Sequence, residues 1–292
     1  MPTSPPRAPR VALETTLLVH GVPPEAARGV ARDLFEAVRS AGAEPALVGV
    51  YSGRARTDLG PAELGELLAA PARVAKVNTS NLGLALHRGG HGATTVSATV
   101  ELAAGAGIRM VATGGIGGVH RGLARRLDVS ADLAALARFP VAVVASGVKS
   151  VLDVAGTREA LEALGVPVLG FGTELFPAFY LRSWSQDLRV DARFDDVADL
   201  ARYLDAELGR TGRGVLVCNP VPPEHEISRA EWDGWLARAG AELRRAGVHG
   251  REVTPFVLGR LHELSAGRTL AANLALARAN AALAGRLAAS WA

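Results

Sequence analysis

Two lysines stand out in this 292-residue chain, because arginine supplies almost all of its basic side chains. Of 32 lysines and arginines, only Lys76 and Lys149 are lysines. Arginine can replace lysine wherever a solvated positive charge suffices, but a guanidinium keeps its proton near neutral pH and cannot attack a carbon atom. A lysine that persists against this bias is a candidate for amine chemistry or for a compact cation in a tight pocket. The alternative is that two ordinary surface lysines remain by chance.

Lys149 has the more informative setting, in the segment "VAVVASGVKSVLD". It follows an apolar run and a glycine, at the expected start of a helix. A glycine turn there places the amine at the edge of a sheet, where burial favours the neutral, nucleophilic form. A P-loop is excluded, because Val148 precedes the lysine where that motif needs glycine. An exposed lysine at a helix start is disfavoured, since its charge opposes the helix dipole.

A carboxyl group and an imidazole lie in comparable places. Glu14 follows an apolar run, and an apolar neighbourhood would raise its pKa and suit it to proton donation, although these residues alone favour an ordinary structural glutamate. His120 closes the glycine-dense segment "ATGGIGGVHRG", which allows backbone amides to approach an anion or a sugar. The histidine is either an acid, base or hydrogen-bond donor, or a structural residue. Its presence also breaks the G-x-G-x-x-G pattern of dinucleotide-binding loops.

The segment "DVSADL" holds two carboxylates with a hydroxyl between them. Asp128 and Asp132 could share a cation and a hydroxylated ligand with Ser130. Ser130 could equally cap a helix, with Asp132 in its first turn, and the two interpretations are compatible. A cation bound at Asp128 alone would keep several water ligands.

The elements that must position these residues alternate along the chain. The apolar runs are continuous, as is typical of strands in a parallel sheet covered by helices on both faces. Ligands of such sheets gather at the carboxyl ends of the strands, where the segments above lie. Strands are expected within 11–19 and at 46–51, 108–113, 141–146, 166–171 and 214–219. Helices are expected at 24–41, 94–107, 131–138, 150–164, 195–208, 229–246, 254–265 and 268–290.

These elements predict an α/β fold, a three-layer α/β/α arrangement with a mostly parallel central sheet and a helical C-terminal portion. We expect one domain over residues 10–292 and a flexible tail over residues 1–9, which is rich in proline. An irregular strand order and a small antiparallel piece near 180–195 stay open.

Composition narrows the classes of protein further. A hydrophobic fraction of 49% with 21% charged residues is ordinary for a globular protein. No apolar run approaches the ~20 residues of a membrane span, and the first ten residues do not fit a signal peptide. The one cysteine, Cys218, lies in an apolar run and is expected to be an inert core thiol, which suits a cytoplasmic protein. Arginines are dispersed without interleaved aromatic residues, which argues against nucleic-acid binding.

Nine segments, taken together, resemble the pseudouridine-5′-phosphate glycosidases, an indigoidine synthase A-like family. The resemblance runs through most of the chain and is densest over residues 12–180. It implies an α/β/α fold, a homotrimer and a divalent cation, typically Mn²⁺. It also implies reversible cleavage of the C–C glycosidic bond of pseudouridine 5′-phosphate to uracil and ribose 5-phosphate. The segments are "ALETTLLVHGVP", "KVNTSNL", "GATTVSATV", "ATGGIGGVHRG", "DVSADL", "VASGVKSVLD", "LGVPVLGFGTELFPAFY", "NPVP" and "TPFVLGRLHEL" with "ANLAL".

The resemblance also implies roles for individual residues. Lys149 would form an imine with C1′ of the opened ribose, and Glu14 would be the proton donor. Lys76 would bind the substrate through its phosphate, and Asp128 would bind the metal. His120 and Asp132 complete the catalytic candidates. The other substrate-binding candidates are Thr95, Val96, Ser130, Ala131 and Asn273, with Asp132 also among them.

The segment 76–81 departs from the family pattern. The family usually has Lys-Val-Ser-Arg-Arg-Asp where this chain has "KVNTSN". Whether this chain keeps the phosphate affinity, the local salt bridges and the trimer contact that the family has at this segment is therefore an open question. "ETT" in place of Glu-Ser-Thr is a milder change. The departure favours one alternative, a related Schiff-base C-glycosidic lyase acting on a different C-nucleotide. A second alternative is a non-catalytic sugar-phosphate-binding homologue, against which the retention of Glu14, Asp128 and Lys149 argues.

Overall fold

A computed structural model describes residues 8–121, 127–247 and 253–291. Ten strands of this part of the chain form one sheet, in the order β4-β5-β2-β1-β6-β7-β10-β8-β9, with β3 paired to β2. The strands are β1 (Arg10–Glu14), β2 (Glu44–Tyr51), β3 (Arg54–Arg56), β4 (Ala75–Val77), β5 (Gly92–Thr94), β6 (Met110–Ala112), β7 (Ala142–Ala145), β8 (Val168–Phe171), β9 (Ala192–Phe194) and β10 (Val215–Cys218).

The sheet is mostly parallel, as predicted. Seven neighbouring strands are all parallel to one another, in the spatial order β2, β1, β6, β7, β10, β8 and β9. At the edge of the sheet, β4 is parallel to β5. The antiparallel pairs are β2 with β3 and β2 with β5. All residues of the central strands β6, β7 and β10 are buried, which explains their continuous apolar runs. Cys218 ends β10 fully buried, and burial raises the pKa of its thiol, so it is the inert core thiol that was predicted.

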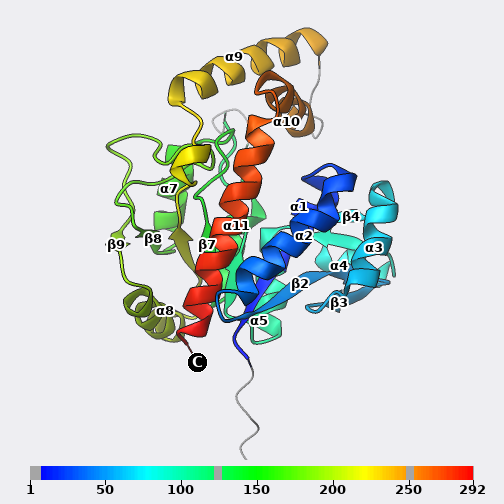
Figure 1. The fold of residues 1–292 in the computed structure, drawn as a ribbon, viewed down its shortest axis with the longest axis vertical. Helices are drawn as coiled ribbons and strands as arrows, with labels where there is room; N and C mark the ends of the chain where they lie inside the picture. The colour runs from blue at the N-terminus through cyan, green and yellow to red at the C-terminus, as the bar shows by residue number, and fades with distance from the viewer. Residues whose placement is uncertain (1–7, 122–126, 248–252, 292) are drawn as a thin grey trace, which may run out of the picture.

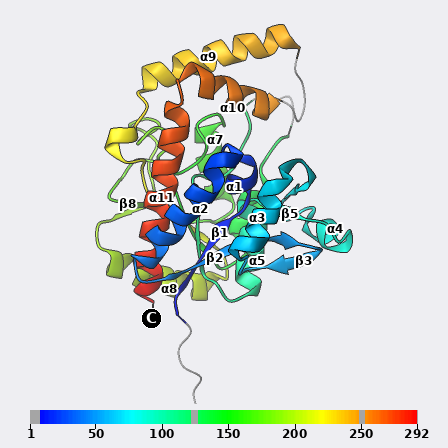
Figure 2. The same ribbon diagram turned by 45° about the vertical axis from the view of Figure 1, so that its right-hand side comes forward.

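Helices cover both faces of this sheet. On one face, α2 and α11 lie side by side, and α11 also contacts α8 and the strands β1, β6 and β7 (Figures 1 and 2). On the other face, α5 packs on α6 and contacts β1, β2 and β6. The predicted three-layer arrangement is therefore confirmed. The main helices are α1 (Thr16–His20), α2 (Pro24–Arg39), α3 (Pro61–Ala69), α4 (Leu82–His87), α5 (Val96–Gly105), α6 (Ala131–Arg138), α7 (Val154–Ala163), α8 (Val197–Thr211), α9 (Arg229–Ala246), α10 (Val253–Leu264) and α11 (Arg268–Ala289).

The C-terminal portion is helical, as predicted. Helices α9 and α10 pack on each other at the top of the molecule, and α11 descends from them along the sheet (Figure 1). Ser228 begins α9 with a capping box, in which its side chain and that of Glu231 bind each other's backbone amides. In the residues that the structure describes, no helix combines the length and apolar character needed to cross a membrane.

One helix begins later in the structure than the sequence predicts. The helix expected from about residue 150 begins at Val154, because the Asp153 side chain caps it by accepting a hydrogen bond from the Gly156 amide at 2.9 Å. Lys149 therefore lies in a turn before that helix. The small antiparallel piece left open near 180–195 is present only as isolated bridges, which join Leu175 with Arg189 and Ala178 with Leu181, whereas strand β9 is parallel to β8.

The sequence predicted no helix or strand between β2 and α5, yet this segment folds into three short strands, two α-helices and a 3-10 helix at Pro71–Arg73. Strands β3, β4 and β5 have three residues each, too few to display an alternating pattern. The pairing of β3 and β5 with β2, and of β4 with β5, extends the sheet at one edge. It brings Lys76, on β4, to the carboxyl ends of the main parallel strands.

Candidate active site

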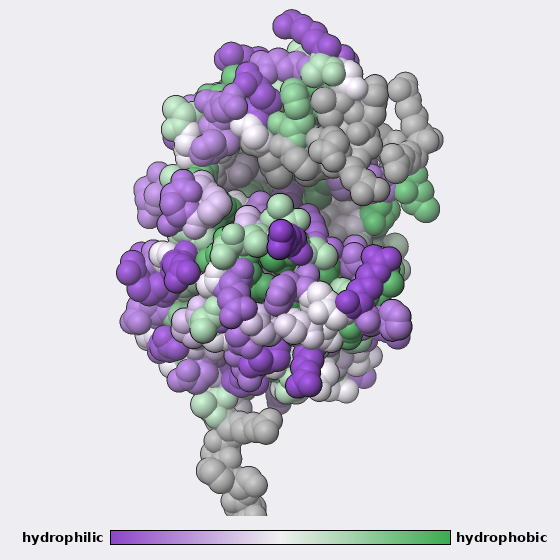
Figure 3. All heavy atoms as spheres, turned by 90° about the vertical axis from the view of Figure 1, so that its right-hand side faces the viewer, coloured by the Kyte–Doolittle hydropathy of each residue, from purple (hydrophilic) through white to green (hydrophobic). Residues whose placement is uncertain are grey.

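One cavity of about 1080 Å³ collects the polar segments at the carboxyl ends of the strands. Loops after β1, β4, β6 and β7 line it, and residues of α10 and α11 close its upper side. The face over α1 to α4 is mostly hydrophilic and is hollowed below the helical C-terminal portion (Figure 3). All eleven residues predicted from the sequence line this cavity: Glu14, Lys76, Thr95, Val96, His120, Asp128, Ser130, Ala131, Asp132, Lys149 and Asn273.

Glu14 is the last residue of β1, and its carboxylate meets a residue from the neighbouring strand. Strands β1 and β6 pair in parallel with Leu13 opposite Ala112, so Glu14 lies beside Thr113. The Thr113 hydroxyl donates a hydrogen bond to the Glu14 carboxylate. Burial raises the pKa of Glu14, an effect that the positive charge of Lys149 and the Thr113 hydrogen bond oppose. The sheet thus holds a carboxyl group with a raised pKa against the cavity.

The turn that carries Lys149 is fixed from both sides. The Ile116 amide donates to the Gly147 carbonyl at 3.0 Å, and the Lys149 amide donates to the Ile116 carbonyl at 3.1 Å. Gly147 has φ +68°, and a Cβ atom there would lie 1.9 Å from the Pro177 carbonyl oxygen. Only glycine fits this position. The Ser150 hydroxyl then donates to the Ala178 carbonyl at 2.5 Å, so the turn is fastened after the lysine as well.

Asp132 is buried, with 5% of the residue exposed, and binds the glycine-rich loop and helix α5 at once. Its Oδ2 accepts a hydrogen bond from the Gly117 amide at 2.8 Å, and its Oδ1 accepts one from the Ser97 amide at 2.9 Å. Ser97 lies in the first turn of α5, where a negative charge is stabilised by the helix dipole. Both carboxylate oxygens are therefore used in joining the glycine-rich loop to α5, which is a positioning arrangement.

Ser130 caps α6, as one of the two interpretations of the sequence predicted. Its hydroxyl accepts a hydrogen bond from the Asp132 amide at 3.2 Å, and Asp132 lies in the first turn of the helix. The Ser130 amide also donates to the Gly118 carbonyl at 2.9 Å. The cap therefore ties α6 to the glycine-rich loop while Ser130 and Ala131 line the cavity.

Lys76 projects from β4 into the same charged cluster. Burial lowers the pKa of Lys76, the charge of Lys149 lowers it further, and the carboxylates of Glu14 and Asp132 oppose both effects. Two ammonium groups and two carboxylates thus influence one another across one cavity. A cavity with this balance can attract an anionic substrate and hold an amine and a carboxyl group near it.

Two asparagines, Asn78 and Asn81, hold the turn after Lys76. The Asn78 Oδ1 accepts hydrogen bonds from the Ser80 and Asn81 amides at 2.9 and 3.2 Å. In return, the Asn81 Oδ1 accepts from the Asn78 amide at 2.8 Å, and its Nδ2 donates to the Lys76 carbonyl at 3.1 Å. The turn is therefore held by neutral side chains. The first threonine of "ETT", Thr15, is fully buried and donates to the Val48 carbonyl at 2.9 Å, a bond that a serine hydroxyl can also make.

Asp128 and His120 lie at the exposed rim of the cavity. The His120 amide donates to the Asp128 carbonyl at 2.9 Å, which fixes the two backbones together. Among the residues with described positions, no three His, Cys, Asp or Glu side chains form a group able to hold a metal ion. A single exposed carboxylate fits a divalent cation that takes most of its ligands from water and substrate, as Mg²⁺ and Mn²⁺ do at phosphate sites.

Several residues that line the cavity were not predicted from the sequence. His20 ends α1, six residues after Glu14, and its pKa is lowered by burial and then by the charge of Lys76. It follows a strand end, so the rule that found Glu14 could have found it. His262 and Thr269 come from α10 and the start of α11. No local pattern marks them, because their position depends on how the C-terminal helices fold over the sheet.

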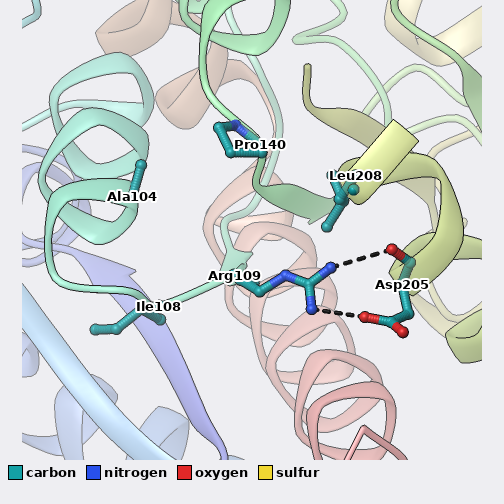
Figure 4. Close-up of a pocket in the computed structure, with 7 residues that line it drawn as sticks. Ala104, Ile108, Arg109, Pro140, Asp205 and Leu208 are labelled. Carbon is teal, nitrogen blue, oxygen red and sulfur yellow. Dashed lines mark hydrogen bonds and ion pairs between the residues drawn. The ribbon is translucent and has the colours of Figure 1, made fainter. Parts of the chain in front are cut away.

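A second hollow, of about 500 Å³, lies near the opposite ends of the strands (Figure 4). Arg109 and Pro140 precede β6 and β7, and Asp205 comes from α8. The Arg109 guanidinium donates to the Asp205 carboxylate at 2.6 Å and to its carbonyl at 3.2 Å, and it stacks on the Trp291 ring at 5.0 Å. None of the predicted site residues lines this hollow. Its polar groups join α8 and the end of α11 to the sheet, so we assign it a structural role.

The fold and the cavity define a class of protein: α/β proteins that hold a lysine amine and a buried carboxyl group at the carboxyl ends of a mostly parallel sheet. Within that class, the chain belongs to the indigoidine synthase A-like family. The family model described as "Indigoidine synthase A like protein" matches residues 5–290. The family predicted from the sequence motifs is thereby confirmed.

Relatives and solved structures agree with this assignment. The pseudouridine-5′-phosphate glycosidase of a Nocardioides species is 46% identical over 98% of this chain and 92% of its own length. That of Paracoccus denitrificans is 47% identical over 98% of this chain and 94% of its own. The chain also resembles the crystal structure of the prealnumycin C-glycosynthase in complex with ribulose 5-phosphate, with a TM-score of 0.89, 35% identity and coverage of 97% and 91%. An indigoidine synthase A-like protein from Thermotoga maritima has a TM-score of 0.88, 38% identity and coverage of 97% and 93%.

Proposed function

We propose that this protein is an enzyme that reversibly cleaves the C–C glycosidic bond of pseudouridine 5′-phosphate, giving uracil and ribose 5-phosphate. The observation that carries the proposal is that Lys149 and Glu14 line one cavity in a chain with close relatives of that name. A C–C glycosidic bond has no basic leaving atom, so simple hydrolysis is slow. An amine that forms an imine supplies the missing electron sink.

In the first step, the neutral Lys149 amine attacks C1′ of the ribose. The Nζ–C1′ bond forms as the C1′–O4′ bond breaks, and Glu14 donates its proton to O4′, which becomes a hydroxyl. The amine then loses one proton, which can restore the Glu14 acid. The raised pKa of Glu14 suits this role, because the carboxyl group must carry a proton before the step and recover it afterwards.

In the second step, the nitrogen lone pair forms the C1′=N bond as the C1′–C5 bond to the pyrimidine breaks. The electron pair of the broken bond stays on C5, which takes up the proton of the restored Glu14 acid, and uracil leaves. Water then hydrolyses the imine to the C1′ aldehyde of ribose 5-phosphate and releases the Lys149 amine. The proton set free when the iminium is hydrolysed returns to Glu14. The overall reaction consumes one water molecule, so it needs no oxidant or reductant.

Lys76 is assigned to the phosphate group. Its ammonium lies on the edge strand β4, and a compact cation binds phosphate well without imposing a planar geometry. Thr95, Val96, Ser130, Ala131 and Asn273 line the remaining wall and are assigned to substrate binding. His120, at the rim, is assigned to the catalytic residues. The two hydrogen bonds of Asp132 instead favour a role in holding the glycine-rich loop against α5.

Three further properties follow the family resemblance. We assign Mn²⁺ to Asp128, with water and substrate oxygens as its other ligands; when bound, the ion would supply positive charge beside the substrate. We also propose a homotrimer, and a cytoplasmic location in keeping with the single, buried cysteine.

The test is a turnover assay with pseudouridine 5′-phosphate, with and without Mn²⁺, in which uracil release is followed by absorbance and chromatography. Borohydride trapping with ribose 5-phosphate provides a second readout, and peptide mapping should locate the adduct on Lys149. Absence of uracil release at high enzyme concentration would refute the proposed substrate.

One observation favours a second candidate. The chain has the fold of a C-glycosynthase crystallised with ribulose 5-phosphate, and its 76–81 segment lacks the usual arginines. A related imine-forming enzyme could join or separate a pentose phosphate and a different aromatic carbon. Parallel assays with several C-nucleotides discriminate, because the glycosidase should prefer pseudouridine 5′-phosphate. Ligand binding without any turnover would instead support a non-catalytic sugar-phosphate-binding protein.

A further inference from the structure

A buried side-chain amide lies behind the cavity, at a position that the proposed mechanism does not use. Asn280 is in the middle of α11, which runs along the sheet, and none of its surface is exposed. Its Nδ2 lies 2.8 Å from the Thr113 carbonyl oxygen, 3.3 Å from that of Gly114 and 3.2 Å from the Ser146 hydroxyl. Its Oδ1 accepts a hydrogen bond from the Asn219 Nδ2 at 3.0 Å.

These partners share one structural position. Thr113, Ser146 and Asn219 are the residues that directly follow β6, β7 and β10, three neighbouring strands of the sheet. The backbone joins the same points, because the Ser146 amide donates to the Gly114 carbonyl at 2.9 Å and the Asn219 amide to the Ala145 carbonyl at 2.9 Å. One amide group therefore fixes the carboxyl ends of three parallel strands relative to one another.

Two of these strand ends lead directly to the reactive groups. The Thr113 hydroxyl donates to the Glu14 carboxylate. Ser146 precedes Gly147, whose positive φ begins the turn that carries Lys149. The proton donor and the amine thus depend on two loops that Asn280 joins, although Asn280 itself does not line the cavity.

We propose that Asn280 is a positioning residue that sets the distance between the Glu14 carboxyl group and the Lys149 amine; this inference rests on the proposed imine chemistry. The amide is needed because it donates and accepts at once. Aspartate has the same shape, but it cannot donate to the Thr113 and Gly114 carbonyl oxygens and would place a negative charge against them. A small displacement of reacting groups costs rate more than binding.

The test compares N280D with S146A, which removes one hydroxyl from the network, and with L283A. Leu283 is a core residue of the same helix and none of the hydrogen bonds described above involves it, so L283A controls for lost stability. The readouts are kcat and KM for uracil release and the rate of borohydride-trapped adduct formation with ribose 5-phosphate. For N280D we expect kcat and the trapping rate to fall about 10- to 100-fold while KM stays within about threefold.

L283A should lower the melting temperature and leave kcat per folded molecule unchanged. An N280D enzyme that is folded and keeps kcat and the trapping rate within about twofold of the wild type overturns the proposal. Equal losses in N280D and L283A also overturn it. If N280D does not fold, S146A decides on the same readouts, with an expected loss of about 3- to 10-fold.

The two proposals fail in different ways. Absence of uracil release by the wild-type enzyme refutes the proposed substrate, whereas the trapping rate with ribose 5-phosphate tests Asn280 whichever base leaves. An active wild type with an unimpaired N280D variant refutes only the positioning role.

Discussion

The backbones of Ile116 and Lys149 are hydrogen-bonded directly to each other. The Lys149 amide donates to the Ile116 carbonyl at 3.1 Å, and a parallel bridge joins Ile116 and Val148. The pairing of β6 with β7 therefore continues past the ends of both strands. As a consequence, the sheet sets the backbone position of the lysine, and the glycine-rich loop cannot shift without moving it.

Replacing Lys149 should abolish the covalent chemistry while leaving the fold intact. The K149R variant keeps a positive charge, but its guanidinium cannot become a neutral nucleophile. We expect kcat to fall by about 10⁴-fold or more and the borohydride adduct with ribose 5-phosphate to disappear. Intact-mass spectrometry after trapping measures the adduct. An adduct of undiminished yield in K149R would show that another amine forms the imine.

The strand-end residues could be predicted from the sequence because their signals are local. Glu14 and Lys149 follow continuous apolar runs, and the turn glycine lies two residues before the lysine. Asn280 could not be predicted. It is one polar residue in an alanine-rich helix, and its hydrogen bond to Thr113 spans 167 positions of the chain.

Contacts between distant parts of the chain also explain the other features that the sequence did not predict. His262 reaches the cavity because α10 folds over the strand ends, which no periodic pattern reveals. Strands β3 to β5 are too short to show a period; β3 and β5 depend on pairing with β2, and β4 depends on pairing with β5. The start of α7 at Val154 is decided by the Asp153 cap rather than by the apolar pattern.

Glu14 should impose the descending limb of the pH–rate profile. Its proposed role needs the protonated carboxyl group, and burial raises its pKa above 4.5. Activity is then full below the raised pKa and is lost as the pH rises through it. The E14Q variant should lose about 10²- to 10⁴-fold in kcat, and its remaining activity should lack this limb. Profiles of kcat over pH 5–9 test this; E174Q, at an exposed site away from the cavity, should keep the wild-type profile.

The same raised pKa predicts that stability, like activity, falls as the pH rises through it. The native state binds the Glu14 proton more tightly than the unfolded state does, so wild-type stability falls as the pH rises from 4.5 through the raised pKa. Glutamine at this position carries no charge at any pH. The melting temperature of E14Q relative to that of the wild type should therefore be higher at pH 8 than at pH 5. A difference independent of pH would contradict burial of an ionisable Glu14.

Lys76 should control binding of the phosphate more than the chemical step. For K76A we expect KM to rise about 10- to 100-fold, the cost of one charged hydrogen bond, with a smaller change in kcat. Burial and the charge of Lys149 lower the pKa of Lys76 below 10.5, so its charge is lost as the pH rises through that lowered value. Wild-type KM should increase over the same range. The K76R variant keeps its charge, and its KM should not change with alkaline pH; a parallel increase would assign the effect to another group.

Asp128 should determine the concentration of Mn²⁺ that the enzyme requires. Loss of one anionic ligand in D128N should raise the Mn²⁺ concentration for half-maximal activity by about 10- to 100-fold. The measurement is uracil release by chelator-treated enzyme as Mn²⁺ is added back. D195N, at an exposed carboxylate away from the cavity, is the matched control. Equal Mn²⁺ requirements in D128N and D195N would exclude Asp128 as the ligand.

Gly147 and Gly172 offer a matched test of the turn that carries the lysine. Both have φ +68°, so alanine at either position costs about 1–2 kcal/mol of backbone strain. A Cβ at Gly172 meets open space, whereas one at Gly147 would lie 1.9 Å from the Pro177 carbonyl oxygen. We expect G172A to lose only the strain energy and to keep its activity. G147A should lose more than about 4 kcal/mol, or displace Lys149 and lose kcat. Denaturant unfolding and turnover measure both, and equal effects of the two substitutions would contradict the steric argument.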